Sequence, residues 1–347
     1  MRCIFFSTIL TLSFVLNFYV LVRLSTLLPI KRGIVFWVIA FLCSISLITA
    51  TIIRGYSDNF ISKSLFMIVT NWYGILWLLF STLIVYEFVR LFIKINPVTA
   101  GYSIIGFVGL LTIYSFLNTQ FLHVKKIEIP GNINCRIVHI SDIHIGSISK
   151  WFFKRIINEI QTQEPDIVLI TGDLVDNMNH NTVTALQELK RLKVPIYFTT
   201  GNHERYAGLE KAQQELEKLN VTVLRNDYAD TNDFRIIGID DGLSDIEIKN
   251  IAERYVDKSK YNILMYHRPL DIDLLSQTGA NLTISGHTHK GQIFPFYFVV
   301  KYFFPNIYGR YEYPGGILNV SSGCGTWGPR MRLGSRSEIM KIEIKRQ

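Results

Sequence analysis

Charged residues are absent from four long stretches in the first third of this 347-residue chain. Each stretch lacks Asp, Glu, Lys and Arg and is long enough to cross a hydrocarbon core of roughly 30 Å as a helix. The stretches are residues 3–22, 33–53, 66–86 and 97–122. They predict an all-α transmembrane region of four helices over residues 1–122, and so an integral, multi-pass membrane protein. Because no ionisable residue lies within them, they give no support to a transport or proton-relay function.

A cleaved signal peptide is the alternative for the first stretch. Its apolar run exceeds the usual length of about 7–15 residues, and no small-x-small cleavage site follows it. We therefore expect a membrane span. The flanking Lys and Arg residues divide equally between the two sides of the membrane, so their count leaves the orientation open.

Cysteine is also scarce, and the four cysteines lack the spacing of a metal site or of a dense disulfide framework. Basic runs interleaved with aromatic residues are missing, so we expect no nucleic-acid partner. The formal net charge of +8 indicates instead an anionic membrane surface or an anionic substrate.

Residues 123–347 form the second predicted domain, in which strand-like and helix-like segments alternate. Strands are predicted at residues 124–129, 136–141, 167–171, 195–200, 221–224, 234–239, 262–266, 281–285, 316–321 and 337–344. Helices are predicted at residues 150–163, 181–192, 208–219, 245–255 and 272–276. We expect residues 221–224 and 234–239 to be a further pair of strands. The alternation predicts an α/β domain.

Polar residues follow five of these strands at the points where the strands end. The clusters are Asp142-Ile143-His144, Gly172-Asp173, Gly201-Asn202-His203-Glu204, His267 and Gly286-His287-Thr288-His289. In α/β sheets, ligand-binding groups collect at the carboxyl ends of strands. Together the clusters supply enough carboxylate, amide and imidazole ligands for two metal ions. The three glycines precede candidate ligands at sharp turns, where we expect positive φ angles.

The order and spacing of these clusters resemble the calcineurin-like metallophosphoesterase superfamily, whose pattern is D-x-H, G-D, G-N-H-[DE], H and G-H-x-H. Within the superfamily, residues 286–293 (GHTHKGQI) and 321–326 (SSGCGT) are similar to the YkuE-like membrane-associated subgroup. Lys290 departs from the small residue common at its position, and Ser337 from a frequent Pro. The resemblance covers residues 124–345 and not the four apolar stretches.

The resemblance implies a four-layer α/β/β/α sandwich that binds two divalent metal ions, with Asp173 as the ligand that bridges them. It assigns the remaining ligands to one ion as Asp142, His144 and His289, and to the other as Asn202, His267 and His287. His203 is implied as the catalytic residue that stabilises the transition state or protonates the leaving oxygen. A mixed Asp, His and Asn ligand set suits Mn, Fe or Zn better than Mg.

We therefore expect a membrane-anchored, metal-dependent phosphoric ester hydrolase in which a metal-bridging hydroxide attacks phosphorus. Its expected partners are a phosphoester substrate and membrane lipids. Arg330 and Arg332 are weaker candidates for substrate contact, and a solvated loop is the alternative for both. One alternative function is hydrolysis of a lipid-linked pyrophosphate or phosphodiester, such as a nucleotide-activated acylated sugar of the UDP-diacylglucosamine type. Another is a catalytically idle membrane scaffold or sensor, which the intact ligand set argues against.

Other polar residues have simpler interpretations. His139 lies on an apolar strand and is expected to be a core histidine, whereas His123 and His180 are expected to be solvated. Asp176 is expected in a turn, close enough to Asp173 to orient a ligand.

Overall fold

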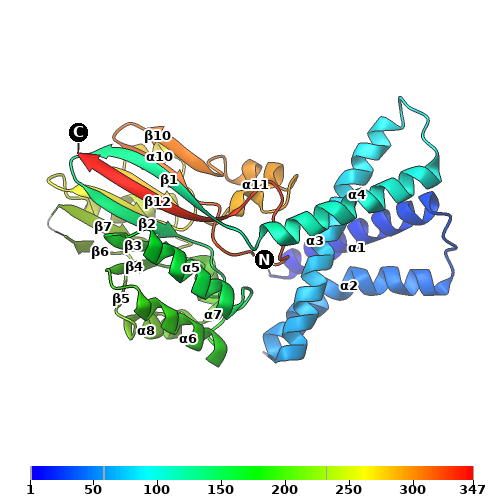
Figure 1. The fold of residues 1–347 in the computed structure, drawn as a ribbon, viewed down its shortest axis with the longest axis horizontal. Coiled ribbons are helices and arrows are strands. Elements are labelled where there is room, and N and C mark those ends of the chain that lie inside the picture. Colours follow the sequence, from blue (N-terminus) through cyan, green and yellow to red (C-terminus); the bar gives the residue numbers. More distant parts are fainter. Residues whose placement is uncertain (1, 58, 232, 347) are drawn as a thin grey trace. The chain divides into compact units, whose positions relative to one another are not determined.

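The computed structural model describes residues 2–57, 59–231 and 233–346 (Figure 1). The chain forms two compact units. The first contains the residues up to Leu117 together with Gly328–Met331, and the second contains Asn118–Trp327 and the residues from Arg332 onward.

The first unit consists of four helices that are long and apolar enough to cross a membrane. They are α1 (Arg2–Leu27), α2 (Ile34–Tyr56), α3 (Phe60–Val89) and α4 (Pro97–Asn118). The last helix is shorter than its predicted stretch, which ran to residue 122, because Leu122 already pairs with Ser337 in a sheet. The segment Gly328–Met331 belongs to this unit, where the backbone N–H of Arg330 donates to Asn71 Oδ1 at 2.8 Å.

Three of these helices, α1, α2 and α3, extend beyond the predicted charge-free stretches. Arg23 near the end of α1 forms an ion pair with Glu87 near the end of α3, and Glu87 also pairs with Arg90. The helices at full length therefore contain charged residues, which lie outside the predicted stretches. Mutual pairing explains how these charges lie on otherwise apolar helices.

The second unit begins with a six-stranded sheet in the order β1-β12-β2-β3-β4-β5. Its strands are β1 (Leu122–Gly131), β12 (Ser337–Arg346), β2 (Cys135–Ile140), β3 (Ile167–Thr171), β4 (Ile196–Thr199) and β5 (Val221–Val223). Side chains alternate between the two faces, so Val138 packs toward the helices and Ile137 toward the other sheet. Strands β2 to β5 are parallel, which brings their carboxyl ends to one edge.

A second six-stranded sheet has the order β10-β11-β9-β8-β7-β6. Its strands are β10 (Gly309–Tyr313), β11 (Gly316–Val320), β9 (Leu282–Ser285), β8 (Tyr261–Met265), β7 (Phe234–Gly238) and β6 (Asp227–Asp230). Strands β5 and β7, which we expected as a pair, thus lie in different sheets. Val221 of β5 packs toward the helices, whereas Phe234 of β7 packs between the sheets, so their apolar side chains serve different layers.

Helices cover the outer face of each sheet (Figure 1). Those on the first sheet are α5 (Lys150–Thr162), α6 (His180–Leu186), the 3₁₀ helix η1 (Gln187–Arg191) and α8 (Leu209–Glu217), and those on the second are α9 (Asp245–Tyr255) and α10 (Ile272–Ser276). Three short helices, α7 (Asn202–Ala207), η2 (His289–Gly291) and α11 (Tyr297–Phe303), complete the unit. The predicted α/β domain with four layers is confirmed. The helix predicted over residues 181–192 is divided between α6 and η1.

Candidate metal centre

The predicted ligands lie where parallel strands of the two sheets end. Asp142 and His144 follow β2, and Asp173 follows β3. Asn202 begins α7 shortly after β4. His267 follows β8, and His287 and His289 follow β9. Each sheet therefore contributes ligands from the carboxyl ends of adjacent parallel strands.

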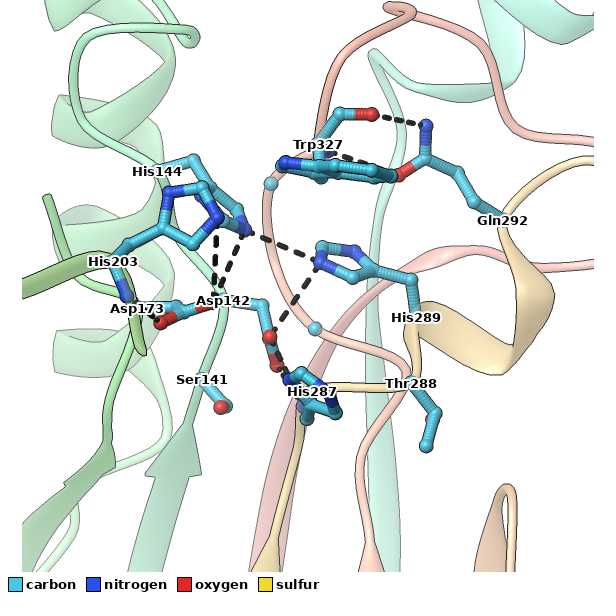
Figure 2. Close-up of polar contacts among 12 residues, drawn as sticks. Ser141, Asp142, His144, Asp173, His203, His287, Thr288, His289, Gln292 and Trp327 are labelled. Carbon is cyan, nitrogen blue, oxygen red and sulfur yellow. Dashed lines mark hydrogen bonds and ion pairs between the residues drawn. The ribbon is translucent and has the colours of Figure 1, made fainter. Parts of the chain in front are cut away.

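The ligand atoms of these residues converge into three groups, in each of which all atoms lie within 4.8 Å of one another. The groups are Asp142, His144 and His289; His144, Asp173 and His203; and Asp173, His267 and His287. Asp173 belongs to two of them, and its Oδ2 lies 3.3 Å from His267 Nε2. Figure 2 shows the imidazoles and carboxylates directed toward a common centre. This arrangement provides one shared carboxylate between two sets of ligands.

The backbone of these residues is held in an unusual conformation. The φ angles are +52° at Asp142, +56° at His144, +51° at Asp173, +69° at His287 and +47° at His289. Positive φ is uncommon for residues other than glycine and costs about 1–3 kcal/mol per residue. Such conformations persist where the surrounding structure enforces them, and they cluster at functional sites.

The expected positive φ angle is confirmed at one of the three glycines, and the other two have a different role. Gly172 has a φ of +74°, but Gly201 and Gly286 have no positive φ. A Cβ atom at Gly201 would lie 2.2 Å from Asp173 Oδ1, and one at Gly286 would lie 2.2 Å from Asp142 Oδ2. Glycine is required at these two positions because the backbone passes next to a ligand carboxylate.

The donor set fits divalent metal ions. Among the residues that the structure describes, none donates a hydrogen bond to Asn202 Oδ1, although this oxygen is buried. A buried amide oxygen without a donor is costly, and a cation would satisfy it. Burial alone would lower the pKa of His267, but Asp173 raises that pKa to about 10. The buried carboxylates therefore favour positive charge in the cluster.

Comparison with known proteins identifies the family. A family model described as calcineurin-like phosphoesterase matches residues 135–291, which include every predicted ligand. An uncharacterized metallophosphoesterase from Campylobacter jejuni is 30% identical over 313 residues, covering 83% of this chain and 84% of that relative. The chain belongs to the calcineurin-like metallophosphoesterase family.

Two further relatives of this metallophosphoesterase are informative. The uncharacterized metallophosphoesterase YkuE of Bacillus subtilis is 30% identical over 247 residues, which cover 64% of this chain and 83% of YkuE. A Danio rerio protein named as a transmembrane protein with a metallophosphoesterase domain is 31% identical over 271 residues, which cover 68% of this chain and 61% of that protein. As a member of the family, the chain is a phosphoric ester hydrolase, and it has four helices that are long and apolar enough to cross a membrane.

Asp176 organises two histidines of the metallophosphoesterase site. Its Oδ1 accepts hydrogen bonds from Nδ1 of His144 at 2.8 Å and from Nδ1 of His203 at 2.9 Å. Burial raises the pKa of Asp176, but the two histidines outweigh burial and hold it well below its usual range. With Nδ1–H donated to this carboxylate, His144 presents Nε2 to the cluster as a ligand atom. The sequence indicated a ligand-orienting role for Asp176, but not that one oxygen serves both rings.

His203 lies at the exposed side of the cluster, with its Nε2 3.9 Å from Asp173 Oδ2. Its backbone N–H donates to Asp173 Oδ1 at 2.8 Å, which fixes the carboxylate of Asp173. The ring is partly exposed, unlike those of His144 and His267. His203 can therefore meet a molecule that enters from solvent.

Glu204 has a structural role that sequence analysis did not assign. Its fully buried carboxylate accepts backbone N–H groups from Asp173, Leu174, Val175 and Gly201 at 2.7 to 3.2 Å. These bonds join the turn after β3 to the turn after β4. The turn that carries Asp173 is thus held by the motif that carries Asn202.

Arg332 lies in the site, whereas Arg330 belongs to the helical unit. Arg332 is fully buried and donates to the carbonyl oxygens of Ser322 at 2.8 Å and Gly325 at 2.6 Å. Its Nη2 lies 3.4 Å from His289 Nδ1. Burial lowers the pKa of Arg332 to about 10, so the guanidinium stays charged at neutral pH. Its burial excludes a solvated loop at Arg332, and substrate contact stays a prediction for both arginines.

Proposed function

We propose that this chain is a multi-pass, membrane-anchored phosphoesterase that uses two divalent metal ions held at the ends of the two sheets. The single observation that carries the proposal is the membership of Asp173 in two adjacent ligand groups. Two cations placed close together repel each other, and a shared carboxylate offsets that repulsion. The same grouping is difficult to explain as ordinary structural polarity, because His144, Asp173 and His267 are buried and several members have positive φ angles.

We assign the residues to two ligand sets that share Asp173. One set is Asp142, His144, Asp173 and His289, and the other is Asp173, Asn202, His267 and His287. In support, Asp173 groups with His144 on one side and with His267 and His287 on the other. Bound ions would supply a water-derived nucleophile at neutral pH and would neutralise charge on the phosphoryl oxygens. The imidazole nitrogens in both sets favour Mn, Fe or Zn over Mg, which prefers oxygen ligands.

We assign acid catalysis to His203. Asp176 is hydrogen-bonded to its Nδ1, which orients the ring so that Nε2 faces the cluster. From there it can donate a proton to the oxygen that leaves phosphorus, or a hydrogen bond to the charged phosphoryl group. Glu204 and Gly201 keep Asp173 in place during the reaction.

The experiment that tests this function is a substrate and metal panel. Full-length protein is purified in detergent, freed of metal, and supplied with Mn, Fe, Zn or Mg. Turnover is then measured on an aryl phosphate monoester, an aryl phosphodiester and a lipid pyrophosphate. We expect metal-dependent release of product from at least one of them, and none from Asp173→Asn. Absence of turnover with every metal, in protein that still binds metal, would favour an idle scaffold instead.

A lipid-linked phosphodiester or pyrophosphate is the second candidate substrate. It is favoured by the apolar side chains exposed just after the last ligand motif, among them Phe298 and Tyr302. A site that handled soluble phosphoesters alone would have no need of an exposed aromatic rim. The lipid pyrophosphate in the panel distinguishes the two candidates, because it should then exceed the aryl esters in kcat/KM.

A further inference from the structure

The segment that follows the last ligand motif exposes a continuous set of apolar side chains. We call residues 294–304, which contain α11, the aromatic segment. None of the residues of α11 is buried, and Phe298, Tyr302 and Phe303 are 62%, 82% and 69% exposed. A helix in a soluble domain normally turns an apolar stripe toward a core, as α5 does with Phe153 and Ile157. A helix that is apolar and uncovered indicates an interaction surface.

The aromatic segment lies at the rim of the metal centre. The ring of Phe304, which ends α11, lies 5.0 Å from the ring of His287 in an edge-on contact. Trp327 extends the exposed apolar surface and is 58% exposed. Gln292 holds it through two hydrogen bonds, of 2.9 and 3.0 Å, to the Trp327 backbone. Figure 2 shows the Trp327 ring on the side of the cluster where His203 and His289 lie.

The charged residues near the aromatic segment indicate which kind of partner it binds. No Asp or Glu occurs from residue 290 to residue 304, whereas Lys290 and Lys301 lie in this range. Aromatic side chains combined with isolated cations are typical of segments that rest at the boundary between lipid headgroups and acyl chains. By contrast, the surface helix α9 of the same unit carries Asp245, Glu247 and Glu253.

The chain connects the second unit to a membrane helix through a short segment. The helix α4 ends at Asn118 and β1 begins at Leu122, so residues 119–121 alone connect a membrane helix to the sheet. Three residues span at most about 11 Å. Trp327 is followed directly by Gly328–Met331, a segment that belongs to the helical unit.

We propose that the aromatic segment and Trp327 insert into the interface of an anionic bilayer, beside the metal centre. Such a surface would let an amphiphilic phosphoester keep its acyl chains in the lipid while its phosphorus reaches the ligands. The inference rests on the proposed membrane anchoring and does not depend on the choice of metal or on the chemistry. A second copy of this chain is the competing occupant of the surface.

Depth-dependent fluorescence quenching tests the insertion. Full-length protein is reconstituted into vesicles of phosphatidylcholine and phosphatidylglycerol, with or without bromine on the acyl chains. Tyr302→Trp adds a probe in the aromatic segment, and Ile246→Trp adds a matched probe on α9, where Ile246 is 72% exposed. We expect brominated lipid to lower the added emission of Tyr302→Trp by about twofold and to leave that of Ile246→Trp unchanged. Aqueous acrylamide should act in the opposite order.

The outcomes separate this inference from the anchoring on which it rests. Both probes are placed in Trp327→Phe protein, because Trp327 belongs to the proposed surface. The emission of this parent includes Trp72 and Trp77 of α3, so its quenching by brominated lipid reports whether the helices enter the bilayer. If the parent is quenched and Tyr302→Trp responds like Ile246→Trp, the insertion is overturned while anchoring stands. A Tyr302→Trp probe shielded from both quenchers would mean that a second copy covers the surface, and would also overturn it. Lack of quenching in the parent would remove the anchoring itself.

Discussion

The Nε2 atoms of His144 and His289 lie 3.2 Å apart, although 145 residues separate them in the chain. One follows a strand of the first sheet and the other a strand of the second. Nδ1 of His144 is hydrogen-bonded to Asp176, which leaves Nε2 as the nitrogen that a metal ion would bind. A metal ion bound between the sheets accounts for two such nitrogens at this distance, and it explains why both sheets must be formed before the site exists.

Asp173 is predicted to control metal content and turnover together. Asp173→Asn removes one negative charge from the carboxylate shared by the two ligand groups. We expect the variant to lose bound metal and to lower kcat by about a hundredfold or more. Elemental analysis beside steady-state kinetics measures both quantities on the same sample. Wild-type turnover in this variant would contradict the shared-ligand assignment.

His203 is predicted to behave differently, because it acts on the substrate rather than on the metal. His203→Ala should keep the wild-type metal content and lower kcat by about a hundredfold to ten-thousandfold. The loss should be smaller for a substrate with an acidic aryl leaving group, which needs no proton. An equal loss for poor and good leaving groups would argue against acid catalysis by this ring.

The second unit is predicted to fold without the four apolar helices when the truncated chain begins at Asn118. The buried Asn118 amide donates to the carbonyl oxygens of Arg332 at 3.0 Å and Ser335 at 2.9 Å. A chain that begins at residue 124 loses these bonds, each worth about 1 kcal/mol. We expect the chain from residue 118 to hydrolyse a soluble aryl phosphoester, and to melt at a higher temperature than the chain from residue 124. Equal melting temperatures would show that residues 118–121 add no stability.

Acid should weaken one ion pair at the edge of the second sheet. A hydrogen bond from Arg235 lowers the pKa of Asp230 to about 2, with Lys260 adding to the effect. Because the folded pKa lies below the unfolded one, this stabilisation is present above about pH 4 and is lost as pH falls toward 2. Asp230→Asn should therefore melt slightly below the wild type at pH 7, and the difference should shrink at pH 3. Partial exposure of the pair keeps the effect small.

Much of the fold could be predicted because its core strands and amphipathic helices have clear periodicity. The helices Asp245–Tyr255 and Ile272–Ser276 begin and end at the predicted residues. The strand β6 was missed because its residues, Asp-Tyr-Ala-Asp, are poor strand formers at an exposed edge. The helix α11 was missed because an apolar run without a polar face shows no helical period.

The ligand positions could be predicted because each one ends a recognisable strand. The sequence did not predict the backbone conformation that directs these side chains toward the cluster. The expectation of positive φ applied to the glycines, whereas it is mostly the ligands themselves, such as Asp173 and His287, that adopt it. Trp327 directly follows the SSGCGT stretch, but the sequence did not predict that it lies near the last ligand motif, which it contacts through Gln292.

The metal-to-protein ratio of active, full-length protein tests the central claim most directly. Protein purified in detergent is saturated with Mn, Fe or Zn, freed of loose metal, and measured by elemental analysis beside turnover of an aryl phosphoester. Our account predicts about two ions per chain, loss of turnover with a chelator and recovery on readdition of metal. Undiminished turnover in chelator-treated protein that holds no metal would contradict it.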